Sequence, residues 1–168
     1  WYYIGSLHYA LEEFREAIEA FNSYNEIALE PNDDVYIRIA TAYYQLEQYQ
    51  EALAPLRRNM EIARAKGKTI PESTYGLLRA IYLTLEDYPN ARQVLRELVV
   101  LFNKSADWAL LGAINGQLEN FNEQAQTYYV ANVGRHLDTE SQFINLASQL
   151  YNNDNPFGCA TTILKGIE

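Results

Sequence analysis

The chain has 168 residues, of which 48% are hydrophobic and 21% are charged, values close to those of ordinary globular proteins. We therefore expect it to fold around a core and not to remain disordered. Its 22 acidic and 13 basic side chains give a formal charge of −9, and that field repels nucleic acid. The apolar run from Leu98 to Phe102 is far shorter than the roughly 20 residues that span a bilayer, so we expect no membrane insertion.

The single cysteine, Cys159, cannot form an internal disulfide, so cysteine content does not distinguish periplasm from cytoplasm. Cys159 shares an apolar stripe with Ile163, which favours a small buried hydrophobe over a reactive thiol. Trp1 begins inside an apolar pattern, and we expect the chain to be a fragment of a longer protein.

A pattern of aromatic, aliphatic and small residues recurs along the chain. Its clearest copy reads Tyr36-x-x-Ile39-Ala40-x-x-Tyr43, then Tyr49-x-x-Ala52-x-x-x-Leu56. The next copy, shifted from position 36 to position 75, reads Tyr75-x-x-Leu78-Arg79-x-x-Tyr82, then Tyr88-x-x-Ala91-x-x-x-Leu95. Further copies begin at Trp1, Trp108 and Phe143, which gives five units at about 1–30, 32–67, 70–103, 105–135 and 138–168. Such a period indicates a single stacked solenoid.

Each unit reads as a helical hairpin. Its apolar residues fall at i, i+3, i+4 and i+7, which is one stripe of an α-helix, and a second stripe follows a short polar turn such as Glu47-Gln48. No strand is expected. The predicted helix starts and stops are Asn32 or Asp33, Pro71, Pro89, Ser105, Asp138 or Thr139, Gly67 and Gly134. Small residues at Ala52 and Ala91 allow close packing, and the aromatic residues in the repeat, Phe121 included, are expected in the core.

The pattern resembles the tetratricopeptide repeat (TPR), whose motif combines W-x2-L-G-x2-Y with later aromatic and alanine positions. Trp108, Leu111 and Gly112 match its first part, and the copy from Tyr36 to Leu56 matches nearly all of it. The resemblance covers the whole chain and implies an all-α, right-handed superhelical solenoid of about five TPR-like hairpins. Gln124 departs from it, because it stands where the motif has a small residue.

The stretch from Gly67 to Leu137 is similar to TPR proteins that accompany the TonB–ExbB–ExbD energy-transduction systems of Gram-negative bacteria. The segments that carry this similarity are P-E-S-T-Y-G-L-L-R-A-I-Y-L-T-L-E-D-Y, R-E-L-V-V-L-F and W-A-L-L-G-A-I-N-G-Q-L. The similarity implies a periplasmic scaffold that assists transport and binds TonB-complex components; a cytoplasmic location is the alternative.

No constellation of residues predicts an enzyme, a cofactor or a metal site. The two histidines, His8 and His136, have no Cys, Asp or Glu at a ligand-like spacing, and we expect structural or solvent-exposed roles for them. The pairs Glu12-Glu13 and Asp33-Asp34 are expected at a turn and at a helix start, where negative charge stabilises the helix dipole.

A binding groove is predicted on the face of each first helix that lies off the core stripe. Its residues are apolar, aromatic or amide-bearing, without Lys or Arg: Tyr2, Tyr9, Ile37, Thr41, Tyr44, Gln45, Leu83, Thr84, Gln117, Tyr151 and Asn152, with Ser6, Gly116 and Ser148 between them. Such a surface suits an extended or helical segment of a partner protein, with tyrosines as anchors and amides bonding to its backbone.

Three functional hypotheses follow. The first is a protein-binding scaffold that holds a neutral, partly apolar segment in this groove. The alternative is a helical-repeat domain that binds a lipid or glycan, or that assists an enzyme. Self-association through exposed apolar stripes at the two end repeats is the third, because terminal repeats normally carry a polar outer face.

Overall fold

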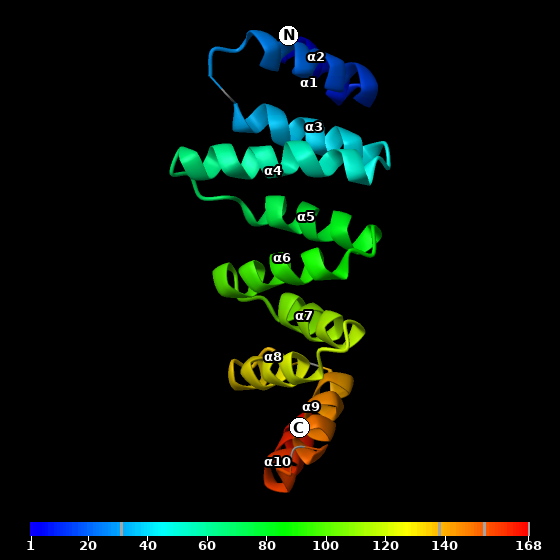
Figure 1. Ribbon diagram of the computed structural model, residues 1–168, viewed down its shortest axis with the longest axis vertical. Coiled ribbons are helices and arrows are strands. Elements are labelled where there is room, and N and C mark those ends of the chain that lie inside the picture. Colours follow the sequence, from blue (N-terminus) through cyan, green and yellow to red (C-terminus); the bar gives the residue numbers. More distant parts are fainter. Residues whose placement is uncertain (31, 138, 153, 168) are drawn as a thin grey trace. The chain divides into compact units, whose positions relative to one another are not determined.

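The computed structural model describes residues 1–30, 32–137, 139–152 and 154–167. These residues form ten α-helices and no strand (Figure 1). In chain order the helices are α1 Tyr2–Ala10, α2 Phe14–Ile27, α3 Asp33–Gln45, α4 Tyr49–Ala65, α5 Glu72–Thr84, α6 Tyr88–Leu101, α7 Ser105–Gln117, α8 Phe121–Val133, α9 Glu140–Asn152 and α10 Pro156–Ile167. The predicted all-α repeat architecture is confirmed, with two helices in each predicted unit.

The chain divides into two compact units, Trp1–Asp87 with α1 to α5 and Tyr88–Glu168 with α6 to α10. In the first unit, α1 packs on α2 and α3 packs on α4. In addition, α3 contacts α2 and α5 contacts α4, so each of these first helices lies against the preceding hairpin. In the second, α7 packs on α8, α9 packs on α10, and α9 also contacts α8. Figure 1 shows α3 and α4 running antiparallel, as a helical hairpin requires.

A small residue on the first helix of a hairpin allows close approach of the second helix. A Cβ atom built on Gly5 would lie 2.7 Å from the ring of Phe21, and one built on Gly112 would overlap the ring of Tyr128. Each aromatic residue stands 16 positions after its glycine. The spacing between the glycine and the aromatic residue therefore corresponds to a packing contact between the two helices of the hairpin.

Phe21 and Tyr128 occupy equivalent positions on the second helix of their hairpins. We call the residue at this position in any hairpin its slot residue. The five slot residues are Phe21, Leu56, Leu95, Tyr128 and Ile163. The first four are at most 3% exposed, whereas Ile163 is 44% exposed. In the first unit, Phe21 shares a core cluster with Val35 and Ile39 of α3. The first helix of the next hairpin therefore completes the burial of the slot residue.

The turn inside each hairpin uses an acidic residue in the left-handed region. The five residues have φ between 54° and 60°, and they are Glu12, Glu47, Glu86, Glu119 and Asp154. This conformation costs an ordinary residue roughly 1 kcal/mol and more commonly falls on glycine. The sequence indicated these short turns, but it gave no sign that a glutamate would adopt such a backbone.

Most of the predicted helix boundaries are close to those observed. Asn32 caps α3 by accepting a 3.0 Å hydrogen bond from the backbone N–H of Asp34. Gly67 follows α4 with φ of 65°, and Pro71 directly precedes α5. The predicted cap at Ser105 is wrong by one residue, because α7 already begins there and Lys104 is its N-cap. Thr139 directly precedes α9, and the alternative, Asp138, lies outside the described residues.

Burial of the aromatic residues in the repeat is only partly as predicted. Tyr75 is 4% exposed and Tyr128 is 3% exposed, as expected for core residues. Phe121 was expected in the core but is 60% exposed, which is a correction. It is the first residue of α8, where the preceding turn leaves its side chain at the surface.

An ion-paired cluster joins the start of α3 to the end of α4. Lys68 donates hydrogen bonds to both carboxylate oxygens of Asp33 at 2.8 Å, and Lys66 lies 3.4 Å from one of them. Asn59 donates a 2.7 Å bond to the backbone carbonyl of Asp33. The hydrogen bond from Lys68 lowers the pKa of the Asp33 carboxyl below its ordinary value of 3.8.

Replacing Gly112 with alanine tests the helix contact that the repeat spacing encodes. We expect Gly112→Ala to lower the free energy of unfolding by about 1–3 kcal/mol, because the buried Tyr128 ring has no room to move. Gly76→Ala is the matched control, since a Cβ atom there meets nothing within 4 Å and alanine favours a helix. Chemical denaturation followed by circular dichroism measures both. A Gly112→Ala variant as stable as Gly76→Ala would contradict the packing.

The Asp33 cluster predicts a dependence of stability on pH. A carboxyl with a lowered folded-state pKa stabilises the fold above its unfolded-state value and stops doing so as the pH falls through the folded-state value. We expect Asp33→Asn to reduce the free energy of unfolding by about 1 kcal/mol at neutral pH, with the difference disappearing in strong acid. The control is Glu61→Gln, whose ion pair with Arg58 is exposed. A constant difference across this pH range would exclude the ionised Asp33 as its cause.

Candidate functional site

The first predicted groove tyrosine, Tyr2, belongs to a polar cluster between α1 and α3. Its hydroxyl donates a 2.9 Å hydrogen bond to Asp34, and Arg38 Nε donates a 3.0 Å bond to the same carboxylate oxygen. The Arg38 guanidinium also lies over the Tyr2 ring, 6.0 Å from its centroid. Hydrogen bonding to the Asp34 carboxylate raises the pKa of Tyr2.

Tyr9 is a partly buried member of the same surface. It packs against the core cluster of the first unit and meets Phe14 edge to face, with ring centroids 5.4 Å apart. Burial raises the pKa of Tyr9, while the nearby charge of Arg38 opposes that shift. The prediction that the groove holds no basic residue is therefore wrong at this end, because Arg38 lies beside two of its tyrosines.

Four predicted groove residues lie on α3, and their spacing places them on one face of that helix. Thr41 bonds to the backbone carbonyl of Ile37 at 2.7 Å, so its hydroxyl is directed along the helix. Tyr44 packs edge to face on Tyr49 at 5.4 Å, and Gln45 is exposed. This face thus combines a fixed aromatic ring with an accessible amide.

The remaining groove residues are divided between the two units. Leu83 and Thr84 lie at the end of α5, where Leu83 is half-buried and the Thr84 hydroxyl bonds to the carbonyl of Ala80 at 3.0 Å. Gln117 is the exposed last residue of α7 in the second unit. Each unit therefore presents its own part of the predicted surface.

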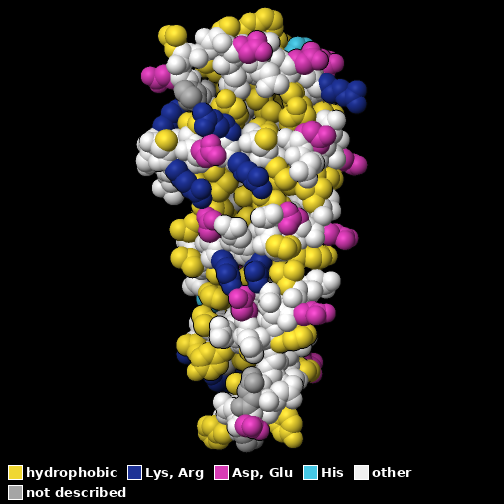
Figure 2. Space-filling view, in the orientation of Figure 1, with side chains coloured by type: hydrophobic (Ala, Val, Ile, Leu, Met, Phe, Trp, Pro, Cys, Tyr) yellow, Lys and Arg dark blue, Asp and Glu magenta, His cyan; other side chains and the backbone are white. Residues whose placement is uncertain are grey.

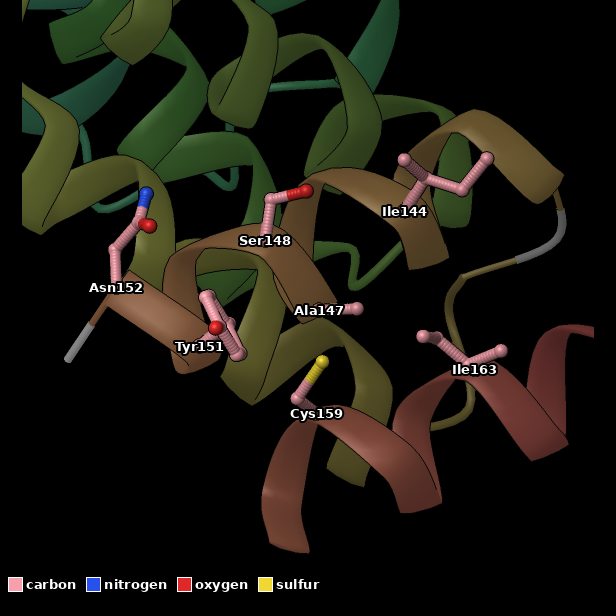
Figure 3. A pocket seen from close by; sticks show the side chains of 7 residues that line it. All are labelled: Ile144, Ala147, Ser148, Tyr151, Asn152, Cys159 and Ile163. Atoms are coloured by element: carbon pink, nitrogen blue, oxygen red, sulfur yellow. The ribbon is translucent and has the colours of Figure 1, made fainter. Parts of the chain in front are cut away.

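Tyr151 and Asn152 line a depression between α9 and α10, with a volume of about 290 Å³ (Figure 3). Its lining residues are mostly apolar or small: Ile144, Ala147, Ser148, Tyr151, Asn152, Cys159 and Ile163. Figure 3 shows the Cys159 side chain directed from α10 toward Ala147 and Tyr151. Cys159 was predicted to be a buried small hydrophobe, but it is only half-buried and borders this depression.

We name the α9–α10 depression the open slot, because it contains Ile163, the exposed slot residue. In the first unit, the residues at the corresponding positions of α2 are Ala17 and Phe21, and both are completely buried. Repeat spacing could identify the position of this depression, but only the burial pattern shows that it is open within the described residues.

Sequence reasoning missed a second depression between α8 and α9, of about 420 Å³. It is lined by Ala125, Gln126, Tyr129, Val130, Leu146 and Leu150. Tyr129 and Val130 are more than 45% exposed, and neither occupies a repeat position. An off-pattern pair of large apolar residues was the signal that could have drawn attention to this surface.

Gln124, which stands where the TPR motif has a small residue, fits because of the residues around it. A Cβ atom built on Gly116 would overlap the Gln124 amide, so the glycine makes room for the larger side chain. Gln124 Oε1 also accepts a 2.7 Å hydrogen bond from Gln149 of α9. The substitution joins two hairpins through polar contact instead of close apolar packing.

Both histidines have structural partners. His8 Nδ1 lies 2.6 Å from a carboxylate oxygen of Glu13, a pairing that the sequence pattern did not predict. His136 stacks on Trp108 with ring centroids 6.1 Å apart, and its Nδ1 lies 3.3 Å from the Ser105 hydroxyl. Over the described part of the chain, no group of three or more His, Cys, Asp or Glu side chains could hold a metal ion.

Lys and Arg side chains gather over α4 on the face shown in Figure 2. Several are paired: Arg57 donates a 2.5 Å hydrogen bond to the Tyr82 hydroxyl, Arg58 pairs with Glu61, and the lysines after α4 pair with Asp33. The repeat pattern did not predict this cluster. None of the helices in the described ranges is long and apolar enough to cross a membrane.

Comparisons with known proteins identify the fold. No protein-family model matches the sequence, and no curated protein matches it. Among solved structures, MamA of AMB-1 is similar with a TM-score of 0.63 at 14% identity, over 96% of this chain and 85% of that one. YrrB, described as a TPR protein with an unusual peptide-binding site, has a TM-score of 0.60 at 16% identity, over 97% and 81% of the two chains.

The C-terminal part of a TPR repeat-containing protein from Cytophaga hutchinsonii is also similar, with a TM-score of 0.59 at 16% identity. That match covers 99% of this chain and 64% of the other. Identities this low establish a shared fold, which is the all-α solenoid of TPR proteins.

Proposed function

We propose that this chain is a non-enzymatic scaffold that binds a segment of a partner protein along its first-helix faces. The observation that carries the proposal is the partly exposed face of α3, where Thr41 and Tyr44 are half-buried and Gln45 is exposed. A rigid aromatic ring beside an accessible amide suits recognition of a peptide, because the ring supplies contact area and the amide bonds to the peptide backbone.

The charge arrangement favours a neutral, partly apolar segment. Arg38 is the cation on this surface nearest the tyrosines, and Asp34 neutralises it at 3.0 Å. A strongly acidic peptide would have to displace that carboxylate while approaching a chain whose formal charge is −9. Segments with few charges avoid both costs.

The TPR fold supports this function, since stacked hairpins present continuous faces for extended partners. YrrB is described as having a peptide-binding site, and it shares the fold of this chain at 16% identity. The open slot favours a helix face over an enclosed small molecule, because two helices line it and its volume of about 290 Å³ is at the small end for ligand pockets.

Within this proposal, the partner is a component of a TonB–ExbB–ExbD complex and the compartment is the periplasm. The basis is the similarity of the stretch from Gly67 to Leu137 to the TPR proteins that accompany those systems. Purified periplasmic segments of TonB and ExbD are therefore the first binding partners to test.

Removing the two groove side chains tests the binding surface. We expect Tyr44→Ala combined with Gln45→Ala to weaken binding of the TonB or ExbD segment about tenfold or more in a calorimetric titration, as hot-spot truncations do. Tyr129→Ala combined with Asn122→Ala is the matched control, since both residues are exposed on α8.

Unchanged affinity in the Tyr44→Ala, Gln45→Ala variant, with an unchanged circular dichroism spectrum, would contradict the assignment of this face. Failure of the wild-type chain to bind either segment would reject the TonB partners. A different captured partner whose binding depends on Tyr44 would still support the scaffold.

A further inference from the structure

We propose that the second half of α4, with the residues that follow it, forms a second binding site that takes a short acidic segment of a partner protein. We call this surface the basic face, and it consists of Arg57, Arg58, Arg64, Lys66 and Lys68. All five side chains are exposed, and Figure 2 shows Lys and Arg gathered over α4. This site goes beyond the proposed groove on α3 and shares no residue with it.

Charge is unevenly distributed along the chain. Residues 57–68 carry five of the 13 basic side chains and one of the 22 acidic ones, a formal charge of +4. The rest of the chain therefore carries a formal charge of −13, since the total is −9. Physiological salt largely screens exposed charges more than about 8–10 Å apart, so an approaching anion responds mainly to the charges nearest to it. The basic face can thus attract an anion although the whole chain is acidic.

Two carboxylates offset part of the positive charge. Glu61 lies 3.1 Å from Arg58, and Asp33 lies 2.8 Å from Lys68 and 3.4 Å from Lys66. The Arg58–Glu61 pair is open to water, with side chains that are 50% and 62% exposed. Exposed pairs of this kind are weak, because water and salt screen them. A carboxylate of a partner can therefore compete with Glu61 for Arg58.

Arg57 is held in place by a neutral partner. Its Nη2 donates a 2.5 Å hydrogen bond to the Tyr82 hydroxyl of α5, and its guanidinium lies over the Tyr82 ring, 5.9 Å from the centroid. Tyr82 is 3% exposed, so the surrounding helices fix this ring. The contact positions the guanidinium without neutralising its charge. A positioned guanidinium suits a carboxylate, because its planar set of donors can form two parallel hydrogen bonds with the two oxygens.

The length of the basic face favours a short acidic segment over a nucleic acid. Arg57 and Arg64 are seven residues apart on α4, which corresponds to about 10 Å along the helix axis. An extended peptide covers that distance with about three or four residues. A nucleic acid is charged along its whole length and would extend from this face onto a chain that is otherwise strongly acidic. A peptide can end its run of Asp or Glu where the basic face ends.

Fluorescence anisotropy with a labelled hexaglutamate peptide tests the site on the whole chain. We expect binding at low ionic strength that weakens as salt is added, and no binding of hexaglutamine. Arg57→Gln combined with Arg58→Gln is expected to weaken hexaglutamate binding about tenfold, because it removes two guanidinium groups that pair with carboxylates. If circular dichroism shows that the double variant is misfolded, Arg58→Gln alone provides the test, since that side chain is half exposed.

The matched control is Arg15→Gln combined with Lys165→Gln. It removes the same charge from exposed positions on α2 and α10, so it changes the net charge equally and leaves the basic face intact. We expect this variant to bind hexaglutamate within about twofold of the wild-type affinity. An equal loss of binding in the control and in the double arginine variant would overturn the proposal, because net charge alone would then explain it.

Two further outcomes would overturn the proposal. One is a wild-type chain that binds hexaglutamate no better than hexaglutamine at low ionic strength. The other is a six-nucleotide single strand of DNA that binds as tightly as hexaglutamate, because the face would then accept any polyanion. The Tyr44→Ala, Gln45→Ala variant should keep its affinity for hexaglutamate, which separates this site from the groove on α3.

Discussion

The whole structure depends on one packing constraint: a helical hairpin cannot bury its second helix without help from the hairpin that follows. Phe21 and Tyr128 are buried because α3 and α9 contribute to the clusters around them. Close approach within each hairpin is possible because Gly5 and Gly112 leave room for those rings. Stability is then a sum of hairpin and neighbour contributions, and any slot without a neighbour remains exposed apolar surface.

This constraint also separates structural from functional residues. The apolar stripe of each first helix packs against the neighbouring helices. Only the side chains outside that stripe are therefore accessible to a partner protein. Tyr44 and Gln45 are in that position on α3, whereas Tyr2 and Tyr9 are partly committed to core contacts at α1. Arg38 and Asp34 add a neutral ion pair to the same surface. For the proposed binding, we therefore expect shape and backbone hydrogen bonding to matter more than net charge.

Sequence reasoning predicted the features that repeat and missed those that occur once. The spacing that separates Gly112 from Tyr128 also separates Gly5 from Phe21, so periodicity was enough to predict helices, turns and core. Exposure of Phe121 depends on the local direction of one turn, and the position of Arg38 over Tyr2 depends on side-chain conformations in two helices. Neither feature recurs in the other repeats, so the periodic pattern could not predict it. The groove residues on α3 share one face of that helix, and their role in binding stays a prediction, because the repeat pattern does not encode it.

The reactivity of Cys159 is the most direct measurement of whether the open slot between α9 and α10 exists. This residue is the single cysteine of the chain and borders the open slot, so the rate at which a thiol reagent modifies it reports access to that surface. The account predicts rapid modification of the folded chain, because Cys159 is half-buried and borders the depression. A Cys159 that reacts only on unfolding would contradict the account.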